Sequence, residues 1–318
     1  MGTPAFAVSI LEKIADGAPG TLIACYCQPD TPANRGHKVL PPPAALWAKA
    51  HGIPVYQPQT LKTDDCYAQL QALKPDFLVV AAYGKIIPER ILKLPTYPPL
   101  NVHGSLLPFY RGAAPIQRAI LEHGEEGAKT GVSIMEMVAE LDAGSVFAQE
   151  EIPIANATAD ELFVTVAEKG GALLCAVMKD LLEGKAKALA QDHSRATYAA
   201  KLEKSDGHIQ WYDSAQAVHA RIRAVTSKPG AHTTLSFPDG ATIPIVFEPG
   251  CIGEPTTASP ATLARKNDLL MIACLDRWYC LGRIKPQGKK YMDVAAFING
   301  YIQKHSSDCK EGFVGTVF

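Results

Sequence analysis

Residues 99–108 read PLNVHGSLLP, an apolar start that leads into an amide, an imidazole and a bent loop. The two polar side chains, Asn101 and His103, are two positions apart, which places them on one face of a β-strand. Gly104 and Pro108 follow, and a proline cannot continue the hydrogen-bonding ladder of a strand. The stretch therefore predicts a short strand that ends at His103 and presents polar groups where it stops.

Strand and helix signals alternate on the N-terminal side of this stretch. Apolar runs predict strands at 21–27, 53–58 and 76–83. Between them, helices are expected at 42–51 and 64–73. This alternation is typical of an α/β domain with a mostly parallel sheet covered on both faces.

The chain continues with a strand pair and a long helix. The strands are expected at 130–137 and 144–152. The helix begins at Thr158, which forms a capping box with Glu161. We place the end of this first domain at residue 184.

Composition changes after Gly184. Residues 185–206 are polar and charged and suit a linker, so the second domain is expected at 207–318. It opens with a predicted helix at 214–225. Short strands follow at 231–237, 241–248, 269–274 and 278–284. Short strands separated by glycine, proline and aspartate indicate a small barrel or sandwich.

The chain opens on MGTPAFA, a Gly-Thr-Pro turn that runs directly into a helix. An α/β domain normally feeds such a turn from a strand, and none precedes this one. We therefore expect that the first strand is absent from the 318 residues, or that the sheet has an unusual edge.

The composition favours a cytoplasmic globular protein. Apolar residues make up 47% of the chain and the formal charge is −1, so any nucleic-acid contact must come from local patches. There is no apolar run of membrane-spanning length and no signal-peptide pattern. Eight cysteines without CxxC spacing suggest reduced thiols, with no zinc site. Because no extended apolar face is left over, we expect a monomer.

Asn101 and His103 become chemically interesting if 99–103 is a parallel strand, because ligands of open α/β sheets sit beyond the carboxyl ends of the strands. An amide beside an imidazole can stabilise a developing oxyanion and move a proton. Asp142, at a turn between two expected strands, could orient the imidazole. The residue types alone leave a second interpretation open, in which a buried histidine is satisfied by a carbonyl and Asp142 forms an Asx turn.

Several segments together resemble the methionyl-tRNA formyltransferases. They are MGTPAFA, QPDTPANRGHKVLPPP (28–43), AAYGKIIP, NVHGSLLPFYRGAAPIQRAI, LDAG, ATYAAKLEKSDGHIQW and IKPQGKKYM. The resemblance implies a Rossmann-like formyltransferase domain joined to a C-terminal barrel resembling an oligonucleotide-binding fold. It also implies transfer of the formyl group of 10-formyltetrahydrofolate to the amino group of methionyl initiator tRNA.

The resemblance assigns roles to residues at matching positions. Asn101, His103 and Asp142 would be catalytic, with the first two donating hydrogen bonds to the formyl oxygen and the last two moving the proton. No metal is needed. Folate-binding roles fall on Ser105, Leu106, Leu107 and Pro108, with Tyr83 and Gly84 as the facing wall. The basic loop would bind the acceptor end of the tRNA through Arg35 and Lys38.

Other functions remain open at this point. The catalytic pattern is shared by folate-dependent formyltransferases that act on sugars or nucleotides, and by a formyl-folate hydrolase. A catalytically dead tRNA-binding protein is a further alternative. The basic loop and the C-terminal domain favour the tRNA enzyme.

Overall fold

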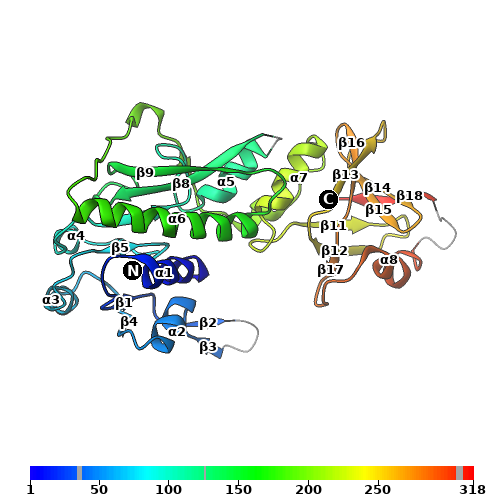
Figure 1. The fold of residues 1–318 in the computed structure, drawn as a ribbon. Coiled ribbons are helices and arrows are strands. Elements are labelled where there is room, and N and C mark those ends of the chain that lie inside the picture. The colour runs from blue at the N-terminus through cyan, green and yellow to red at the C-terminus, as the bar shows by residue number, and fades with distance from the viewer. Residues whose placement is uncertain (34–37, 125–126, 306–310) are drawn as a thin grey trace. The chain divides into compact units, whose positions relative to one another are not determined.

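The computed structural model describes residues 1–33, 38–124, 127–305 and 311–318, and the chain divides into two compact units (Figure 1). Unit 1 comprises Met1–Pro115, Thr130–Pro153 and Leu162–Ala199. Unit 2 comprises Ile116–Lys129, Ile154–Glu161 and Ala200–Phe318. Both units are therefore built from segments that are not contiguous in the sequence.

Unit 1 is an α/β domain, as the sequence predicts. Its helices are α1 (Ala5–Gly17), α2 (Pro43–Ala50), α3 (Asp64–Ala72), α4 (Glu89–Leu92), most of α6 (Ala159–Leu182) and the short η1 (His193–Arg195). Its strands are β1 (Cys25–Tyr26), β2 (Thr31–Ala33), β3 (Lys38–Leu40), β4 (Val55–Tyr56), β5 (Val79–Val80), β6 (Leu100–His103), β7 (Arg111–Gly112), β8 (Lys129–Glu136), β9 (Val146–Pro153) and β10 (Tyr198–Ala199).

The strands of unit 1 pair mainly in parallel. β1 pairs with β4, β5 with β6, and β7 with β10, each in parallel. The largest sheet has the order β5-β6-β8-β9, and β8 joins it antiparallel to β6. The parallel pairs bring the carboxyl ends of β5 and β6 to one edge of the sheet, where His103 ends its strand.

Helix α6 packs closely on this sheet because of two adjacent glycines. A Cβ atom at Gly170 would lie 2.7 Å from a methyl of Val102 in β6 and 2.9 Å from one of Val132 in β8. A Cβ atom at Gly171 would lie 2.7 Å from the side chain of Lys13 in α1. The absence of side chains at these positions lets α6 approach both the sheet and α1.

The sheet of unit 1 is interrupted between β1 and β5, which belong to different sheets. The backbone of Met1 and Gly2 connects the two edges. The N–H of Gly2 donates to the carbonyl of Tyr26, and the N–H of Ala81 donates to the carbonyl of Met1, both at 2.9 Å.

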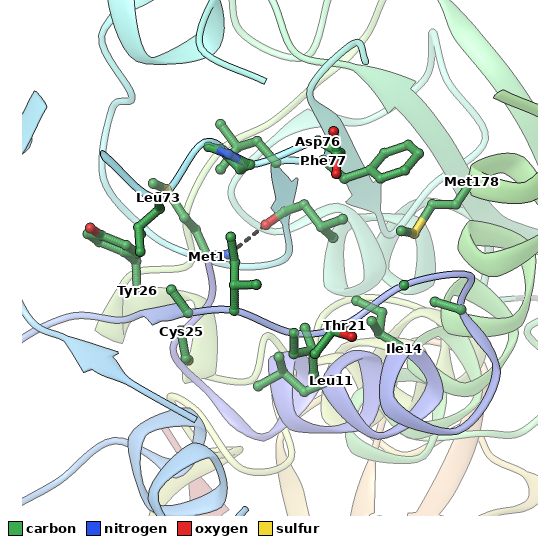
Figure 2. Close-up of a pocket in the computed structure, with 18 of the residues that line it drawn as sticks. Met1, Leu11, Ile14, Thr21, Cys25, Tyr26, Leu73, Asp76, Phe77 and Met178 are labelled. Carbon is green, nitrogen blue, oxygen red and sulfur yellow. Dashed lines mark hydrogen bonds between the residues drawn. The ribbon is translucent and has the colours of Figure 1, made fainter. Parts of the chain in front are cut away.

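An apolar cavity of about 450 Å³ occupies the rest of this gap, lined by the two strand regions, α1 and the end of α6. Figure 2 shows Met1 at its edge, with Phe77 and Met178 on one side and Leu11 and Ile14 on the other. Residues 21–24 and 76–78 border the cavity. This is why β1 and β5 are shorter than the apolar runs that predict them.

Unit 2 is an antiparallel, barrel-like sheet with helices. The strand order is β13-β16-β15-β14-β18-β11-β12-β17. The strands are β11 (His232–Ser236), β12 (Thr242–Phe247), β13 (Cys251–Pro255), β14 (Thr262–Lys266), β15 (Leu269–Ala273), β16 (Arg277–Cys280), β17 (Ile284–Pro286) and β18 (Glu311–Val317). The helical elements are most of α5 (Pro115–His123), η2 (Lys204–Gly207), α7 (Ala215–Ala224), α8 (Val294–Phe297) and η3 (Ile298–Ile302).

Two buried side chains of α7 hold the separate segments of unit 2 together. Arg223, 1% exposed, donates to the carbonyls of Gly124, Ala155 and Ala157 at 2.7, 2.9 and 3.0 Å. His219 lies between the side-chain oxygen of Asn156 and the hydroxyl of Tyr279, at 2.8 and 3.0 Å. Three of these contacts reach the loop at residues 155–157, which the sequence analysis placed in the first domain.

The expected linker is divided between the two units. Residues 185–199 belong to unit 1, where β10 pairs with β7, and 200–206 belong to unit 2. Polar composition suggested a linker, but polar side chains such as Gln191 are buried here because they satisfy backbone groups of unit 1. In the residues that the structure describes, no helix has the length and apolar character needed to cross a bilayer.

The cavity beside Met1 yields a prediction on stability. The terminal ammonium of Met1 donates to the carbonyl of Val79 at 2.5 Å, and burial lowers the pKa of this ammonium. An apolar segment of about six residues fused ahead of Met1 would fill the cavity as a strand and replace the ammonium with a peptide N–H. We expect the melting temperature to rise by about 3 °C or more, since 1 kcal/mol corresponds to roughly 2–4 °C for a domain of this size.

A Gly/Ser extension of the same length is the control. It removes the buried ammonium without filling the cavity. The melting temperature of this variant should therefore lie between those of the unextended chain and the chain with the apolar extension. Equal melting temperatures for the two extensions would show that the cavity does not accept a strand.

The pH dependence of unit 2 yields a second prediction. Burial, and secondarily the charge of Arg223, lowers the pKa of His219 to about 4. The unfolded chain therefore binds more protons at this residue between pH 4 and 6.5, and stability must fall as the pH is lowered through that range. We expect a loss of about 2 kcal/mol between pH 7.5 and pH 5. Urea unfolding at both pH values measures it, and His219→Gln should reduce the loss; an unchanged loss would contradict the assignment.

Candidate active site

Strand β6 separates an apolar face from a polar one. Leu100 and Val102 are buried, and Val102 lies under α6 at the Gly170 position. Asn101 and His103 alternate with them and therefore lie on the opposite face. In the register with β8, these two residues pair with Met135 and Ser133. The structure thus brings the amide and the imidazole together at the carboxyl end of β6, as the spacing predicts.

His103 is buried, and each of its ring nitrogens faces a polar group. Nε2 lies 2.9 Å from the carbonyl oxygen of Tyr110, so Nε2 carries a proton and donates it to this acceptor. Nδ1 lies 3.7 Å from Oδ2 of Asp142. The hydrogen bond on Nε2 leaves Nδ1 as the nitrogen that can exchange a proton with a substrate.

Asp142 lies in the turn between β8 and β9, with a φ of +48°. Its Oδ2 accepts a hydrogen bond of 2.8 Å from the N–H of Gly112. Gly112 itself has a φ of +121°, and a Cβ atom there would lie 2.7 Å from the carbonyl of Ala199. Only glycine fits this close backbone approach, which aims the N–H at the carboxylate.

These contacts combine the two interpretations that the sequence left open. His103 does bind a carbonyl, and Asp142 does bind a backbone N–H, as a purely structural pair would. Both side chains nevertheless keep one polar atom directed at the other, 3.7 Å apart. A structural role and a proton-transfer role are therefore compatible in the same geometry.

Asn101 is half-buried, and its side-chain amide donates no hydrogen bond within the described residues. Its backbone is held by the ladder between β5 and β8. An amide with available N–H groups, carried by a backbone that is held in place, is the kind of donor that stabilises a developing oxyanion.

The segment 105–108 forms a loop whose polar groups largely make hydrogen bonds to other groups of the protein. The hydroxyl of Ser105 donates to the carbonyl of Phe109 at 2.6 Å. The hydroxyl of Ser133 donates to the carbonyl of Ser105 and accepts from the N–H of Leu107, at 2.6 and 3.1 Å. Gln149 donates to the carbonyl of Leu107 at 2.9 Å. The loop is therefore rigid.

The side chains of this loop differ in exposure. Leu107 is buried, whereas Leu106 and Pro108 are partly exposed, and the Leu107–Pro108 peptide is cis. The side chain of Leu106 also packs against the backbone of Gly131, where a Cβ atom would lie 2.4 Å from it. Leu106 and Pro108 can thus contribute apolar surface to a ligand.

Tyr83 and Gly84 follow β5 at the same edge of the sheet, but they present backbone groups there. The ring of Tyr83 lies in the hydrophobic core, and burial raises the pKa of its hydroxyl to about 12. Its carbonyl accepts hydrogen bonds from Thr3 and Gln28 at 3.1 and 2.9 Å. A Cβ atom at Gly84 would lie 2.4 Å from the amide nitrogen of Gln28.

Of the two candidate tRNA-binding residues, Arg35 is outside the described residues. Lys38 begins β3, which pairs antiparallel with β2.

The sequence analysis missed three residues that organise the site: Ser133, Gln149 and Gln191. Ser133 was the one with a signal, as a polar residue within an apolar strand run. Gln149 and Gln191 lie in polar stretches, and only the fold brings them to the loop and to Asp142. Among the described residues, no group of three or more histidine, cysteine and acidic side chains lies close enough to hold a metal.

A family model described as formyl transferase matches residues 1–178, and one described as formyl transferase, C-terminal domain, matches residues 201–302. The methionyl-tRNA formyltransferase of Desulfovibrio desulfuricans is 44% identical over 309 residues, which cover 95% of this chain and 92% of that protein. The chain belongs to the methionyl-tRNA formyltransferase family. The methionyl-tRNA formyltransferase of Pseudomonas putida is 38% identical over 307 residues, which cover 96% of each of the two chains.

Solved structures share the fold at lower identity. An N-formyltransferase from Helicobacter canadensis, in complex with folinic acid and dTDP-3-aminofucose, is 16% identical with a TM-score of 0.62, covering 92% of this chain and 97% of that one. HypX from Aquifex aeolicus, in complex with tetrahydrofolic acid, is 20% identical with a TM-score of 0.57, covering 80% of this chain and 44% of HypX. These structures show the fold alone, and sequence identity identifies the family.

Proposed function

We propose that Asn101, His103 and Asp142 transfer the formyl group of 10-formyltetrahydrofolate to the α-amino group of methionyl initiator tRNA. The observation that supports this is the approach of Nδ1 of His103 to Oδ2 of Asp142, at 3.7 Å, beside the available amide of Asn101. The formyl-folate is a substrate in this reaction and supplies an electrophilic formyl carbon.

Asn101 stabilises the negative charge that develops on the formyl oxygen. The backbone that carries this amide is held by the pairing of β6 with β5 and β8 before the substrate arrives, which limits the reorganisation needed in the transition state. A preorganised donor of this kind contributes about 3 kcal/mol, or roughly a hundredfold in rate.

His103 takes a proton from the attacking amine at Nδ1. Because Nε2 already donates to Tyr110, protonation of Nδ1 produces an imidazolium with a carbonyl oxygen on one side and the carboxylate of Asp142 on the other. Both partners stabilise the positive ring. The separation of 3.7 Å is long for a hydrogen bond, and catalytic contacts commonly shorten only when the substrates are bound.

Asp142 orients the imidazole. The N–H of Gly112 binds the same oxygen that faces His103, which prevents the carboxylate from rotating away. The pair can then return the proton to the folate nitrogen as it leaves.

The folate would bind along the loop 105–108. Leu106 and Pro108 offer apolar surface, and the internal hydrogen bonds of Ser105 and Leu107 keep the loop in shape before binding. The backbone around Tyr83 and Gly84 would form the facing wall. A rigid loop suits a flat aromatic ligand because binding then costs little ordering entropy.

The acceptor, the location and the assembly state complete the proposal. The initiator methionyl-tRNA would bind through the basic loop and the C-terminal domain. The protein would act in the cytoplasm as a monomer, without a membrane. Formylation of charged initiator tRNA, with formyl-folate as donor, tests the function, and formate release without tRNA would instead indicate a hydrolase.

Substitutions in the three catalytic residues form one prediction. We expect Asn101→Ala and His103→Ala to lower kcat about a hundredfold or more, with folate affinity little changed. Asp142→Asn keeps an oxygen for Gly112 but removes the charge, and its effect should be at least as large. Steady-state formylation kinetics and folate titration measure both quantities.

His51→Ala is the matched control, because His51 is an exposed histidine of the same unit that bonds only its own helix. It should retain normal turnover. Near-normal turnover in any of the three catalytic variants would refute the site. A loss of folate affinity alone would reassign the residues to binding.

The basic loop generates a further prediction. Arginine pairs bidentately with phosphate or stacks on a base, which lysine does not reproduce. We expect Arg35→Ala to lower kcat/KM for methionyl-tRNA by about tenfold or more with folate affinity unchanged, and Arg35→Lys to restore only part of it. Lys38→Ala should cost less and reduce the salt dependence by about one phosphate contact. Normal formylation by Arg35→Ala would exclude the loop from tRNA binding.

A further inference from the structure

Gln191 is a buried side chain that contacts the Asp142 turn. It is 8% exposed, and its Nε2 donates to the carbonyl of Asp142 at 2.9 Å and to the carbonyl of Gly144 at 2.7 Å. These two acceptors flank the residue after Asp142. One amide group therefore pins the backbone of the turn on both sides.

Arg111 holds Gln191 in this position. Its Nε and Nη2 both donate to Oε1 of Gln191, at 3.1 and 2.8 Å. The guanidinium is 1% exposed, with Nη2 also 3.3 Å from Nδ1 of His193. Gln191 thus uses two donors and two acceptor positions, which is the full hydrogen-bonding capacity of an amide.

The Asp142 turn needs such an anchor. A non-glycine residue with φ near +48° is in a sparsely populated conformation that persists only where the surroundings enforce it. A Cβ atom at Gly144 would lie 2.0 Å from the carbonyl of Glu136, so this part of the turn runs tightly against β8. A shift of the turn would move the carboxylate away from His103.

Arg111 also precedes Gly112, whose N–H binds the Asp142 carboxylate. One dipeptide therefore acts on both ends of Asp142, on the carboxylate through the Gly112 N–H and on the main chain through Gln191.

We propose that Gln191, held by Arg111, is a positioning residue that sets the separation between the Asp142 carboxylate and the His103 imidazole. The inference rests on the proposed function of that pair. It gives residues 185–199, part of the stretch 185–206 that composition suggests as a linker, a role in the catalytic step.

Gln191→Glu is the main test, because it keeps the volume and the contact with Arg111 but removes the two N–H donors. We expect kcat to fall about tenfold or more, since displacements of about 1 Å can cost up to a hundredfold. KM for the folate should change little, whereas the melting temperature should fall by several degrees because two buried carbonyls lose their donor. Gln191→Met, of similar size and without any polar atom, should reduce kcat at least as much.

A double-mutant cycle separates positioning from a general structural role. In the Asp142→Asn background, Gln191→Glu should lower kcat by less than about threefold, because the charge to be positioned is already gone. An equal loss in both backgrounds would overturn the proposal, as would unchanged kcat in Gln191→Glu and Gln191→Met.

Two controls distinguish this inference from the proposed function. Glu140→Gln removes an exposed carboxylate 3.7 Å from Nη1 of Arg111 and should leave kcat unchanged, since exposed ion pairs contribute little. If Asp142→Asn retains normal turnover, the proposed catalytic pair fails. If Asp142→Asn is inactive but Gln191→Glu is normal, only the positioning role fails.

Discussion

The site depends on one constraint, the rigid backbone of residues 110–112. The carbonyl of Tyr110 binds His103 and the N–H of Gly112 binds Asp142, at 2.9 and 2.8 Å. These two groups are so close in the chain that the imidazole and the carboxylate cannot move independently. The segment is itself held by the parallel pairing of β7 with β10, so residues near 198 stabilise a site built on β6.

This arrangement explains why the candidate site lies where the strands of the sheet end and not in the apolar cavity beside Met1. The 450 Å³ cavity beside Met1 has apolar walls and includes none of Asn101, His103 or Asp142. It lies where the sheet is interrupted, between β1 and β5. The site residues, by contrast, cluster where parallel strands end and backbone groups are free to bind ligands.

Unit 2 shows how buried polar groups can join distant segments. Arg223 satisfies three carbonyls of two loops, and His219 links Asn156 to Tyr279. Each loop carbonyl would otherwise lose its hydrogen bond on burial, at a cost of about 1–3 kcal/mol. This is why Ile154–Glu161 groups with the C-terminal unit although α6 continues from it into the first.

Local patterns in the sequence determined the kind and order of the elements. Alternation in 99–103 predicted β6 and the shared face of Asn101 and His103, and the capping box at Thr158 predicted the start of α6. The sequence analysis did not predict strands β13, β14 and β18, and its expected strand at 278–284 overlaps β17 by the single residue Ile284. Glycines interrupt β13 and β18, β17 has three residues, and two adjacent residues of β14 are both buried, so none of the four shows a continuous alternation in sequence. Pairing with neighbouring strands makes them strands.

Tertiary structure alone decided how the site is held. Nothing near Gln191 in the sequence indicates that its amide binds the turn at Asp142, 49 residues away, or that Ser133 locks the loop at Ser105, 28 residues away. The boundary between the units and the tautomer of His103 were also unpredictable. The physical reason is that periodicity records which face of an element is buried, whereas a hydrogen bond between distant residues depends on where the whole chain places its donor and acceptor.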